Sequence, residues 1–224
     1  MKLTRENLLS GQIRQQIIES GVDIDILSES ELNASRKAAL ASINASEDLW
    51  LFSYGSLMWN PAFNFSERCI GYVHGYHRRF CLWTNLGRGS PDRPGLLLGL
   101  ERGGSCKGIL YRIPAAAVEE ETTIVWAREM ITGAYIPTWI QVRTNGHQET
   151  ALTFAMNRDC KRYTGRLSNS QIAKTIATAE GSIGTCADYL LNTLTHLDEL
   201  GIPDRVLSNI GKQVVSLMTN DTAP

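Results

Sequence analysis

The sequence predicts an α+β protein, and three observations lead to this class. From Leu49 onward, short aromatic and β-branched runs alternate with glycines, a pattern typical of strands. After Ser168 the chain shows stretches of helical character that begin at capping signals and end at glycines. The 224 residues are 43% hydrophobic, which is enough to fill one sizeable core. Strands in the middle of the chain and helices gathered towards its carboxyl end are the arrangement of the α+β class.

The first 46 residues differ in texture from the rest, because they lack aromatic residues and are rich in Ser, Glu, Asn and Ala. We therefore expect an N-terminal helical extension, residues 1–46, followed by a main domain, residues 47–224. Apolar residues recur at helical spacing in two places, at Leu9, Ile13 and Ile17 and again at Leu32, Ala39 and Ile43. Such an arm either packs against the main body or binds a partner.

The strands begin with the continuous apolar run Leu49–Phe52, which is typical of a buried central strand and ends at the turn Gly55-Ser56. The stretch from Gly87 to Gly95 contains two prolines and is predicted to be a loop. The same pattern predicts further strands at 79–83, 95–101, 108–112, 138–142 and 151–156.

One helix interrupts the strands. Pro114 suits its first turn, three glutamates at 119–121 favour its positive end, and Gly133 is a plausible stop. Three more helices are expected later in the chain. They begin at Ser168, near Thr185 and at Pro203, and they run towards Gly181, Gly201 and Met218.

Charge and hydropathy exclude several classes of protein. The formal net charge of -1 gives no basic surface for nucleic acid or for an anionic membrane. No apolar run approaches the roughly 20 residues of a membrane helix, and the first 20 residues lack a signal-peptide core. We expect a soluble cytoplasmic protein without a nucleic-acid or membrane partner. The sequence makes no prediction of oligomeric state.

No metal, disulfide or nucleotide motif is present. The five cysteines are odd in number and form no CxxC pair, and the four histidines show no metal-ligand spacing. Neither a glycine-rich phosphate loop nor a GxSxG elbow occurs. The cysteines are therefore interpreted as reduced core residues, and a metal site is not expected.

The turn after the first strand, residues 53–58, is the first candidate site. A glycine at the end of a central strand lets the backbone turn sharply and point consecutive N–H groups outward. Such a nest suits a carboxylate or a developing oxyanion, although a glycine and a serine after a strand often form only a turn. The residues concerned are Ser53, Tyr54, Gly55, Ser56, Leu57 and Met58.

Glu129 is the second candidate. It continues a helical stripe formed by Val118, Thr122 and Val125, so the face directed at the core ends in a carboxylate. The negative end of the helix dipole and partial burial both disfavour the charged form, which should raise the pKa of Glu129 and make it a more useful base near neutral pH. The alternative is an exposed glutamate or one paired with Arg128.

Six short segments then carry a resemblance to a known family. In chain order they are LFSYGSLMW at 51–59, GYVHGYHRRF at 71–80, PG at 94–95, GILYR at 108–112, a segment at 126–135 that begins WAREM, and YTG at 163–165. In this order they resemble the ChaC-type gamma-glutamylcyclotransferases, from about Leu49 to the carboxyl-terminal region. Three positions depart from the family pattern, since Ser53 and Ala134 replace glycines and Arg166 replaces a proline.

The resemblance implies a gamma-glutamylcyclotransferase-like mixed β-sheet or partial barrel with flanking helices, and a catalytic role for residues 47–224. It implies cleavage of glutathione to 5-oxoproline and cysteinylglycine, by attack of the glutamyl α-amine on the γ-carbonyl and without cofactor. Glu129 would be the general base and then the acid. Residues 53–58 would hold the glutamyl end, through its α-carboxylate, the oxyanion or both, and Tyr135 and Tyr163 would offer hydroxyl contacts.

Two alternatives stay open at this point. Related cyclotransferases act on other gamma-glutamyl peptides or amines, and one sequence does not show the pocket that selects among them. A protein of the same fold would also serve as a non-catalytic regulator, for instance of ion transport, if it only sensed a metabolite.

Overall fold

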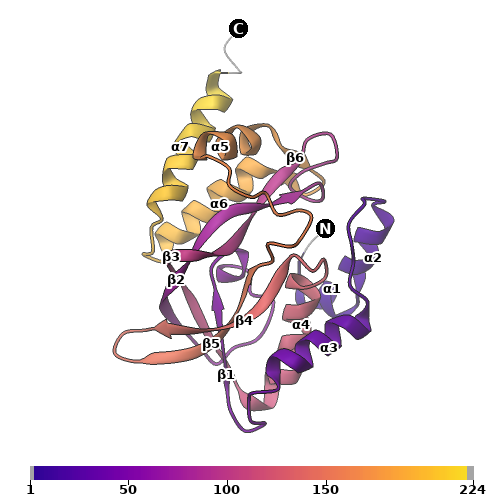
Figure 1. Cartoon of the computed structure of the whole chain (residues 1–224), viewed down its shortest axis with the longest axis vertical. Coiled ribbons are helices and arrows are strands. Elements are labelled where there is room, and N and C mark those ends of the chain that lie inside the picture. Colours follow the sequence, from indigo (N-terminus) through magenta and orange to yellow (C-terminus); the bar gives the residue numbers. More distant parts are fainter. Residues whose placement is uncertain (1–2, 221–224) are drawn as a thin grey trace. The chain divides into compact units, whose positions relative to one another are not determined.

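The computed structural model describes residues 3–220, which divide into two compact units (Figure 1). Residues 3–78 and 99–160 form one unit, and residues 79–98 and 161–220 form the other. The N-terminal helices therefore share a unit with most of the strands. The division into an extension, 1–46, and a catalytic domain, 47–224, stays a prediction.

The first unit is built on a closed five-stranded barrel. Its strands follow the order β1-β3-β2-β4-β5, with further pairing of β5 to β3. The pairs β1–β3, β2–β4 and β4–β5 are antiparallel, whereas β1–β5 and β3–β5 are parallel. This mixed sheet confirms the predicted α+β class. The strands are β1 (Leu49–Ser53), β2 (Glu67–Thr84), β3 (Gly95–Ile113), β4 (Tyr135–Arg143) and β5 (Gln148–Met156).

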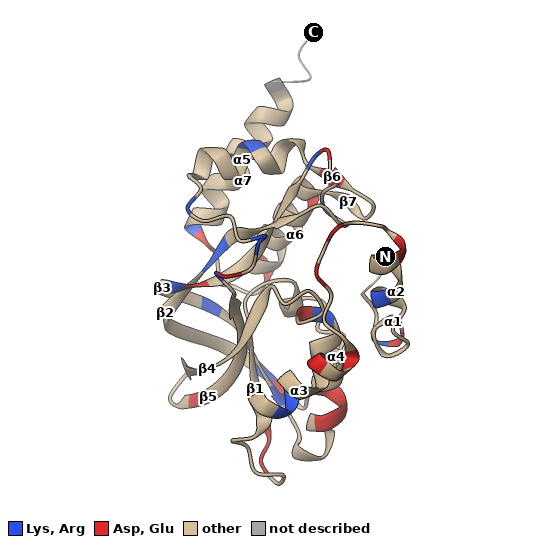
Figure 2. Ribbon diagram, turned by 45° about the vertical axis from the view of Figure 1, so that its right-hand side comes forward, with Lys and Arg blue, Asp and Glu red and all other residues tan. Residues whose placement is uncertain are grey.

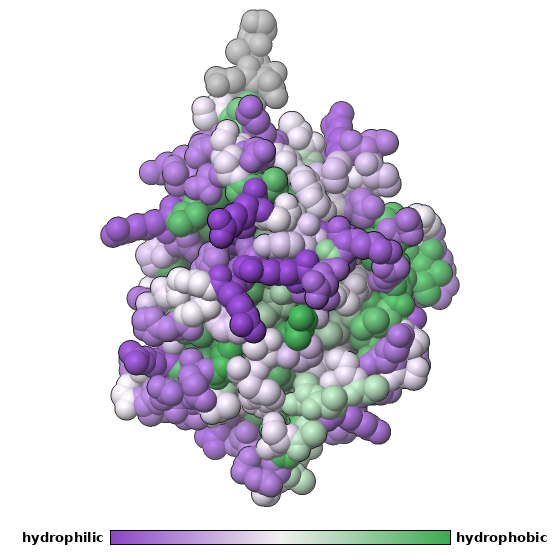
Figure 3. All heavy atoms as spheres, in the orientation of Figure 1, coloured by the Kyte–Doolittle hydropathy of each residue, from purple (hydrophilic) through white to green (hydrophobic). Residues whose placement is uncertain are grey.

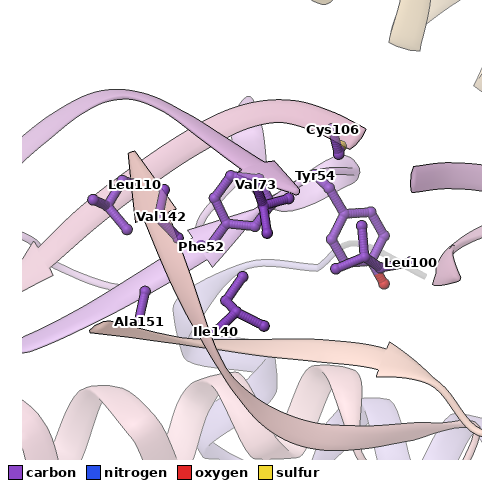
Figure 4. Close-up of a cluster of buried hydrophobic side chains, with 9 residues drawn as sticks. All are labelled: Phe52, Tyr54, Val73, Leu100, Cys106, Leu110, Ile140, Val142 and Ala151. Carbon is purple, nitrogen blue, oxygen red and sulfur yellow. The ribbon is translucent and has the colours of Figure 1, made fainter. Parts of the chain in front are cut away.

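Apolar side chains from all five strands form a core cluster in this unit (Figure 4). The strand β1 is buried along nearly its whole length, as the continuous apolar run predicts. Its Phe52 is 1% exposed and its Tyr54 8% exposed, and both belong to the cluster. The members of the cluster are Phe52, Tyr54, Val73, Leu100, Cys106, Leu110, Ile140, Val142 and Ala151.

The strands β2 and β3 are longer than the sequence pattern predicts. The expected strand 79–83 is only the end of β2, and the two expected strands 95–101 and 108–112 are parts of the single strand β3. The glycines at 103 and 104 look like a break in the sequence. They instead take φ angles of 101° and 68°, which glycine tolerates, and the strand continues through them.

The first unit also contains α1 (Arg5–Leu9), α2 (Gln12–Glu19), α3 (Glu29–Leu40), α4 (Val118–Glu129) and the short 3₁₀ helices η1 (Ser56–Met58) and η2 (Ala115–Ala117). In the predicted stripe Leu9, Ile13 and Ile17, the prediction for Leu9 is wrong. The helix is interrupted at Gly11, which has a left-handed φ of 71°, and with this interruption Leu8 is buried and Leu9 is 51% exposed.

The second predicted helix is confirmed as α3, which contains Leu32 and Ala39, both partly buried. Ile43 was wrongly included, because α3 ends at Leu40, and the fully buried residue of this helix is Arg36. Arg36 is buried because its Nη2 atom lies 2.5 Å from Oε1 of Glu119 on α4. A charge can be buried when it is paired.

The start of α4 is held by arginines of the N-terminal helices. Figure 2 shows acidic residues at this end of the helix. Arg5 pairs with Glu120 and, at 2.5 Å, with Glu121. The Glu121 side chain is only 3% exposed and also accepts the backbone N–H of Asn64 at 2.9 Å. Burial tends to raise the pKa of Glu121, but the bonds from Arg5 and Asn64 outweigh it and the pKa lies below its usual value.

The second unit combines the ends of β2 and β3 with α5 (Asn169–Thr178), α6 (Cys186–Glu199), α7 (Arg205–Asn220) and the two-residue strands β6 (Glu180–Gly181) and β7 (Gly184–Thr185). Capping boxes at Ser168 and Thr185 begin α5 and α6, as predicted. Phe80 meets Tyr189 edge to face, with ring centroids 6.0 Å apart. The pair β6–β7 was not predicted. Across the described residues, no helix combines the length and apolar character that crossing a membrane requires.

Candidate active site

Glu129 is the last residue of α4, and its side chain is 16% exposed. Thr122 and Val125, which precede it on the predicted stripe, are each 1% exposed. Burial raises the pKa of Glu129, and the neighbouring Arg128 opposes this through its charge and hydrogen bond. The net direction is upward, as the position of the residue predicts. A carboxylate in this setting is a stronger base than an exposed one.

Arg128 joins Glu129 to the turn after β1. Its Nε atom lies 3.2 Å from Oε1 of Glu129, and its Nη2 atom donates to Oγ of Ser56 at 2.9 Å. A third bond goes to the carbonyl of Asn60. The Arg128 side chain is only 3% exposed. One buried guanidinium therefore sets the position of Glu129 relative to the turn 53–58.

The turn itself begins a single 3₁₀ turn, η1. The carbonyl of Gly55 accepts the N–H of Met58 at 2.9 Å. The carbonyl of Ser56 accepts the N–H groups of Trp59 and Asn60. The N–H groups of Gly55, Ser56 and Leu57 come before the first bond of this turn, and they find no acceptor within residues 3–220. Three consecutive backbone donors are thus available to an acceptor oxygen.

Two tyrosines hold this turn in place. The hydroxyl of Tyr111, on β3, donates to the carbonyls of Leu57 at 3.1 Å and Met58 at 2.9 Å. The hydroxyl of Tyr54 donates to the carbonyl of Phe154 on β5 at 2.8 Å. Backbone positions fixed from two strands keep the donor groups oriented before any ligand arrives.

Ser53, at the end of β1, is 1% exposed, and its Oγ atom lacks a hydrogen-bond partner within the described residues. Gly108 lies beside it on β3. A Cβ atom at this glycine would stand 2.2 Å from the Ser53 carbonyl, so only glycine allows the two strands to approach this closely. A buried hydroxyl without a partner is costly, so the Ser53 hydroxyl is an exception that needs an explanation.

The other predicted residues take different places. Leu57 and Met58 are 7% and 1% exposed, and Met58 uses its own N–H within the turn, so its contribution is to hold the turn. Tyr135 begins β4 and is partly buried. Tyr163 belongs to the other unit, where it forms a bridge with Leu82.

The cysteines and potential metal ligands do not form a second site. The described residues contain no group of three or more His, Cys, Asp or Glu side chains that would hold a metal ion. The five cysteines are free thiols. Burial raises the pKa of Cys69, and it raises that of Cys186 to about 11, so both are poor thiolates.

Comparison with solved structures identifies the class of fold. The crystal structure of a selenomethionine-labelled gamma-glutamylcyclotransferase specific to glutathione, from yeast, matches with a TM-score of 0.71 at 18% sequence identity. The match covers 79% of this chain and 99% of that one. At this identity the likeness shows the gamma-glutamylcyclotransferase fold alone.

Sequence comparison is more specific. The model of the ChaC-like protein family matches residues 49–217, and the chain therefore belongs to the ChaC-like family. The glutathione-specific gamma-glutamylcyclotransferase of Escherichia coli (strain K12) is 37% identical over 221 residues, which are 98% of this chain and 95% of that protein. The glutathione-specific gamma-glutamylcyclotransferase 1 of Danio rerio is 32% identical over 161 residues, 70% of this chain and 82% of its relative.

Two residues gained importance only from the structure. Arg128 appears in the sequence as a possible partner of Glu129, but its bonds to Ser56 and Asn60 have no local signal. Tyr111 lies in a segment that reads as an ordinary buried strand. A tyrosine among aliphatic residues was the available hint, because a buried hydroxyl needs a partner.

Proposed function

We propose that this chain is a gamma-glutamylcyclotransferase that cleaves glutathione to 5-oxoproline and cysteinylglycine. The observation that carries the proposal is the Arg128 bridge. It links a largely buried carboxylate with a raised pKa, Glu129, to a turn whose backbone donors are unused. The relatives named for this activity support the choice of substrate.

The reaction needs a base, and it needs the substrate to be bent so that its α-amine lies next to its γ-carbonyl. It consumes no water. Glu129 takes a proton from the glutamyl α-amine, and the amine nitrogen attacks the γ-carbonyl carbon to close a five-membered ring. The amide C–N bond then breaks, and Glu129 returns the proton to the departing cysteine nitrogen. Holding the two reacting groups in attack geometry contributes roughly 7–11 kcal/mol of barrier lowering, and a positioned base adds roughly 10²–10⁴-fold.

The turn 53–58 holds the glutamyl end of the substrate in this proposal. The N–H groups of Gly55, Ser56 and Leu57 are the donors for the α-carboxylate, for the oxyanion that develops on the γ-carbonyl, or for both. The unpartnered hydroxyl of Ser53 is a further donor beside them. Tyr135 and Tyr163 are proposed to contact the substrate through their hydroxyl groups.

The test of the base is Glu129→Gln, which keeps the size and a hydrogen-bond acceptor but removes the basic carboxylate. The variant should fold normally. In an assay with glutathione and without metal or nucleotide, its turnover, measured as 5-oxoproline by mass spectrometry, should be at least about 100-fold lower than that of the wild type. Glu180→Gln is the matched control, because Glu180 is an exposed glutamate of β6. Normal turnover in the Glu129 variant would end this assignment.

Substrate choice and catalysis itself are tested with the wild-type protein. Turnover of glutathione well above that of gamma-glutamyl-alanine supports the proposed specificity, and the reverse ranking would move the assignment to other gamma-glutamyl compounds. Binding of glutathione without cleavage over hours would favour the metabolite-sensing regulator. Activity should persist in excess EDTA, since the proposed steps use no metal.

The extension, residues 1–46, is proposed to hold the helix that carries the base. Both ends of α4 are tied to it within the first unit. Arg5 and Arg36 pair with the glutamates at its start, and the Leu27 N–H donates to the carbonyl of Ile131, just past its end, at 2.9 Å. We place the protein in the cytoplasm, which agrees with the use of glutathione as substrate.

A further inference from the structure

Residues 60–65 follow the candidate active-site turn and lead into β2, and polar bonds hold this segment near both of its ends. Near the start, Nδ2 of Asn60 donates to the carbonyl of Leu3 in the N-terminal extension at 3.1 Å. Near the end, the backbone N–H and Nδ2 of Asn64 donate to the carboxylate of Glu121 at 2.9 and 3.1 Å. The segment is therefore tied to the extension at one end and to α4 at the other.

The carboxylate of Glu121 connects Asn64 to α1 of the extension. Its Oε2 atom accepts the backbone N–H of Asn64 and lies 2.5 Å from Nη1 of Arg5. Its Oε1 atom accepts Nδ2 of Asn64 and, at 3.1 Å, Nη2 of Arg5. Each oxygen thus has one partner from the segment and one from the extension. The Glu121 side chain is only 3% exposed, and a buried charge that loses a partner is strongly destabilised, so these four bonds hold Asn64 in place.

The same segment contacts the candidate site at two points. Phe63 meets the ring of Tyr111 edge to face, with centroids 5.3 Å apart, and Phe65 meets it at 4.7 Å. The hydroxyl of this tyrosine donates to two carbonyls of the turn, so a shift of the phenylalanines would move the ring that holds the turn. In addition, the carbonyl of Asn60 accepts a bond from Arg128.

The backbone in the middle of the segment is strained. Among the described residues, Ala62 is the one non-glycine position with a positive φ angle, at 58°. A left-handed φ is unfavourable for a residue with a Cβ atom, and it persists where surrounding contacts leave the backbone no alternative. Here the bonds of Asn60 and Asn64 and the packing of Phe63 supply those contacts. The shape of the segment therefore depends on its ties at both ends.

We propose that Asn64 is a positioning residue for the turn that holds the substrate. The extension holds Asn64 through Glu121, Asn64 keeps the two phenylalanines against Tyr111, and Tyr111 keeps the backbone donors of the turn oriented. Asn64 itself does not touch the substrate. The inference rests on the proposed function, and it gives the extension a task at the turn in addition to its proposed hold on α4.

The first test does not depend on activity. In ¹⁵N-labelled full-length protein, Asn64→Ala removes the Nδ2 bond and keeps the backbone N–H. Two-dimensional NMR should show that the amide signals of Gly55, Ser56 and Leu57 move, in the same direction as in Tyr111→Phe, because both variants loosen the same contact. Asn64 is an exposed residue, so its replacement should leave the fold intact.

The second test measures the reaction. Asn64→Ala should lower kcat/KM for glutathione by at least about fivefold, since a small misplacement of a positioning element is costly in rate. The acid limb of the pH profile should stay at its wild-type position, because Glu129 and Arg128 keep their ion pair. A double variant with Tyr111→Phe should lose less than the product of the two single losses, because the two residues act through one contact.

Two other variants complete the comparison. Arg5→Lys keeps the positive charge but not the two-point bond to Glu121, so it should show the same changes to a smaller extent, and it decides the question if Asn64→Ala does not fold. Figure 3 shows apolar surface over the N-terminal helices, and Ile18 of α2 is 52% exposed. Ile18→Ser is therefore the control within the extension, and it should match the wild type in both tests.

Four results would overturn the inference. They are unmoved turn amides in folded Asn64→Ala, an unchanged kcat/KM, a displaced acid limb, and losses that multiply in the double variant. If the wild type releases no 5-oxoproline from glutathione, the proposed function fails instead, and the NMR comparison alone then decides whether Asn64 positions the turn.

Discussion

Replacing Arg128 by methionine tests whether the bridge between Glu129 and the turn matters for catalysis. Methionine keeps much of the buried stem but removes every donor. The structure assigns this guanidinium bonds to Ser56 and Asn60 and an ion pair with Glu129 at 3.2 Å. The loss of the turn contacts and the loss of the ion pair have different consequences, and one set of kinetics separates them.

The loss of the turn contacts determines the size of the effect. A hydrogen bond to a charged group contributes about 1.5–3 kcal/mol. At about 1.4 kcal/mol for each factor of ten, losing one such bond in the transition state lowers kcat/KM by roughly 10- to 150-fold. Arg128→Lys keeps the charge without the forked geometry and should fall between the wild type and the methionine variant.

The loss of the ion pair determines the pH dependence. Arg128 lowers the pKa of Glu129 against the larger effect of burial, so removing it raises that pKa further. The base then needs a higher pH to be ionised, and the acid limb of the kcat/KM profile should move upward. The ionisation of the substrate is common to both enzymes and cancels in the comparison.

The assay is initial-rate release of 5-oxoproline between pH 5 and 9, with unfolding temperature as a check on the fold. Arg102→Met is the matched control, because Arg102 is an exposed arginine of β3. A folded Arg128→Met enzyme with unchanged kcat/KM and an unmoved acid limb would refute the reasoning that this arginine positions and tunes Glu129.

Three further predictions concern stability. Glu129→Gln should unfold at a higher temperature than the wild type at pH 7. A carboxyl whose pKa is raised in the folded state makes the protein less stable as the pH rises through that pKa. In calorimetry the difference should vanish below about pH 4, where the carboxyl is protonated in the unfolded state as well. Arg5→Ala leaves the carboxylate of Glu121 buried and should cost about 2–4 kcal/mol in urea unfolding at pH 7, with a smaller loss in acid, because the lowered pKa of Glu121 makes its contribution disappear as the pH falls through it; an equal loss at pH 3 would contradict the pairing. Tyr111→Phe removes the bonds to Leu57 and Met58 and should cost about 1–3 kcal/mol of stability together with a lower kcat/KM, and a change in neither would show that the turn holds itself.

The sequence predicted those features of the candidate site, burial and pKa direction, that depend on local periodicity. The stripe on α4 ends in Glu129, and the residues before it are buried as the spacing requires. The direction of its pKa followed from its place at the end of a half-buried helix. The turn after β1 was likewise predictable, because an apolar strand followed by Gly55 leaves few alternatives for the backbone.

Contacts between distant segments were beyond local patterns. The pairing of Arg128 with Glu129 was one of the alternatives that the sequence offered, but nothing in the sequence of α4 shows that Arg128 also reaches Ser56. Arg36 looks like a surface residue, and its burial depends on Glu119, which lies far along the chain. Two-residue strands such as β6 and β7 are too short for any alternating pattern to register.

The way in which the chain passes between its two units affects how it folds during synthesis. Segment 79–98 leaves the ribosome well before the helices α5, α6 and α7, which belong to the same unit and lie within residues 169–220. Phe80 and Leu96 are fully buried in the finished protein, where Phe80 contacts Tyr189 and Leu96 contacts Cys186, both on α6, so these contacts are missing from the nascent chain until α6 emerges. This interval is when chaperones have apolar surface to bind, and a protein truncated after residue 160 would remain in that state permanently.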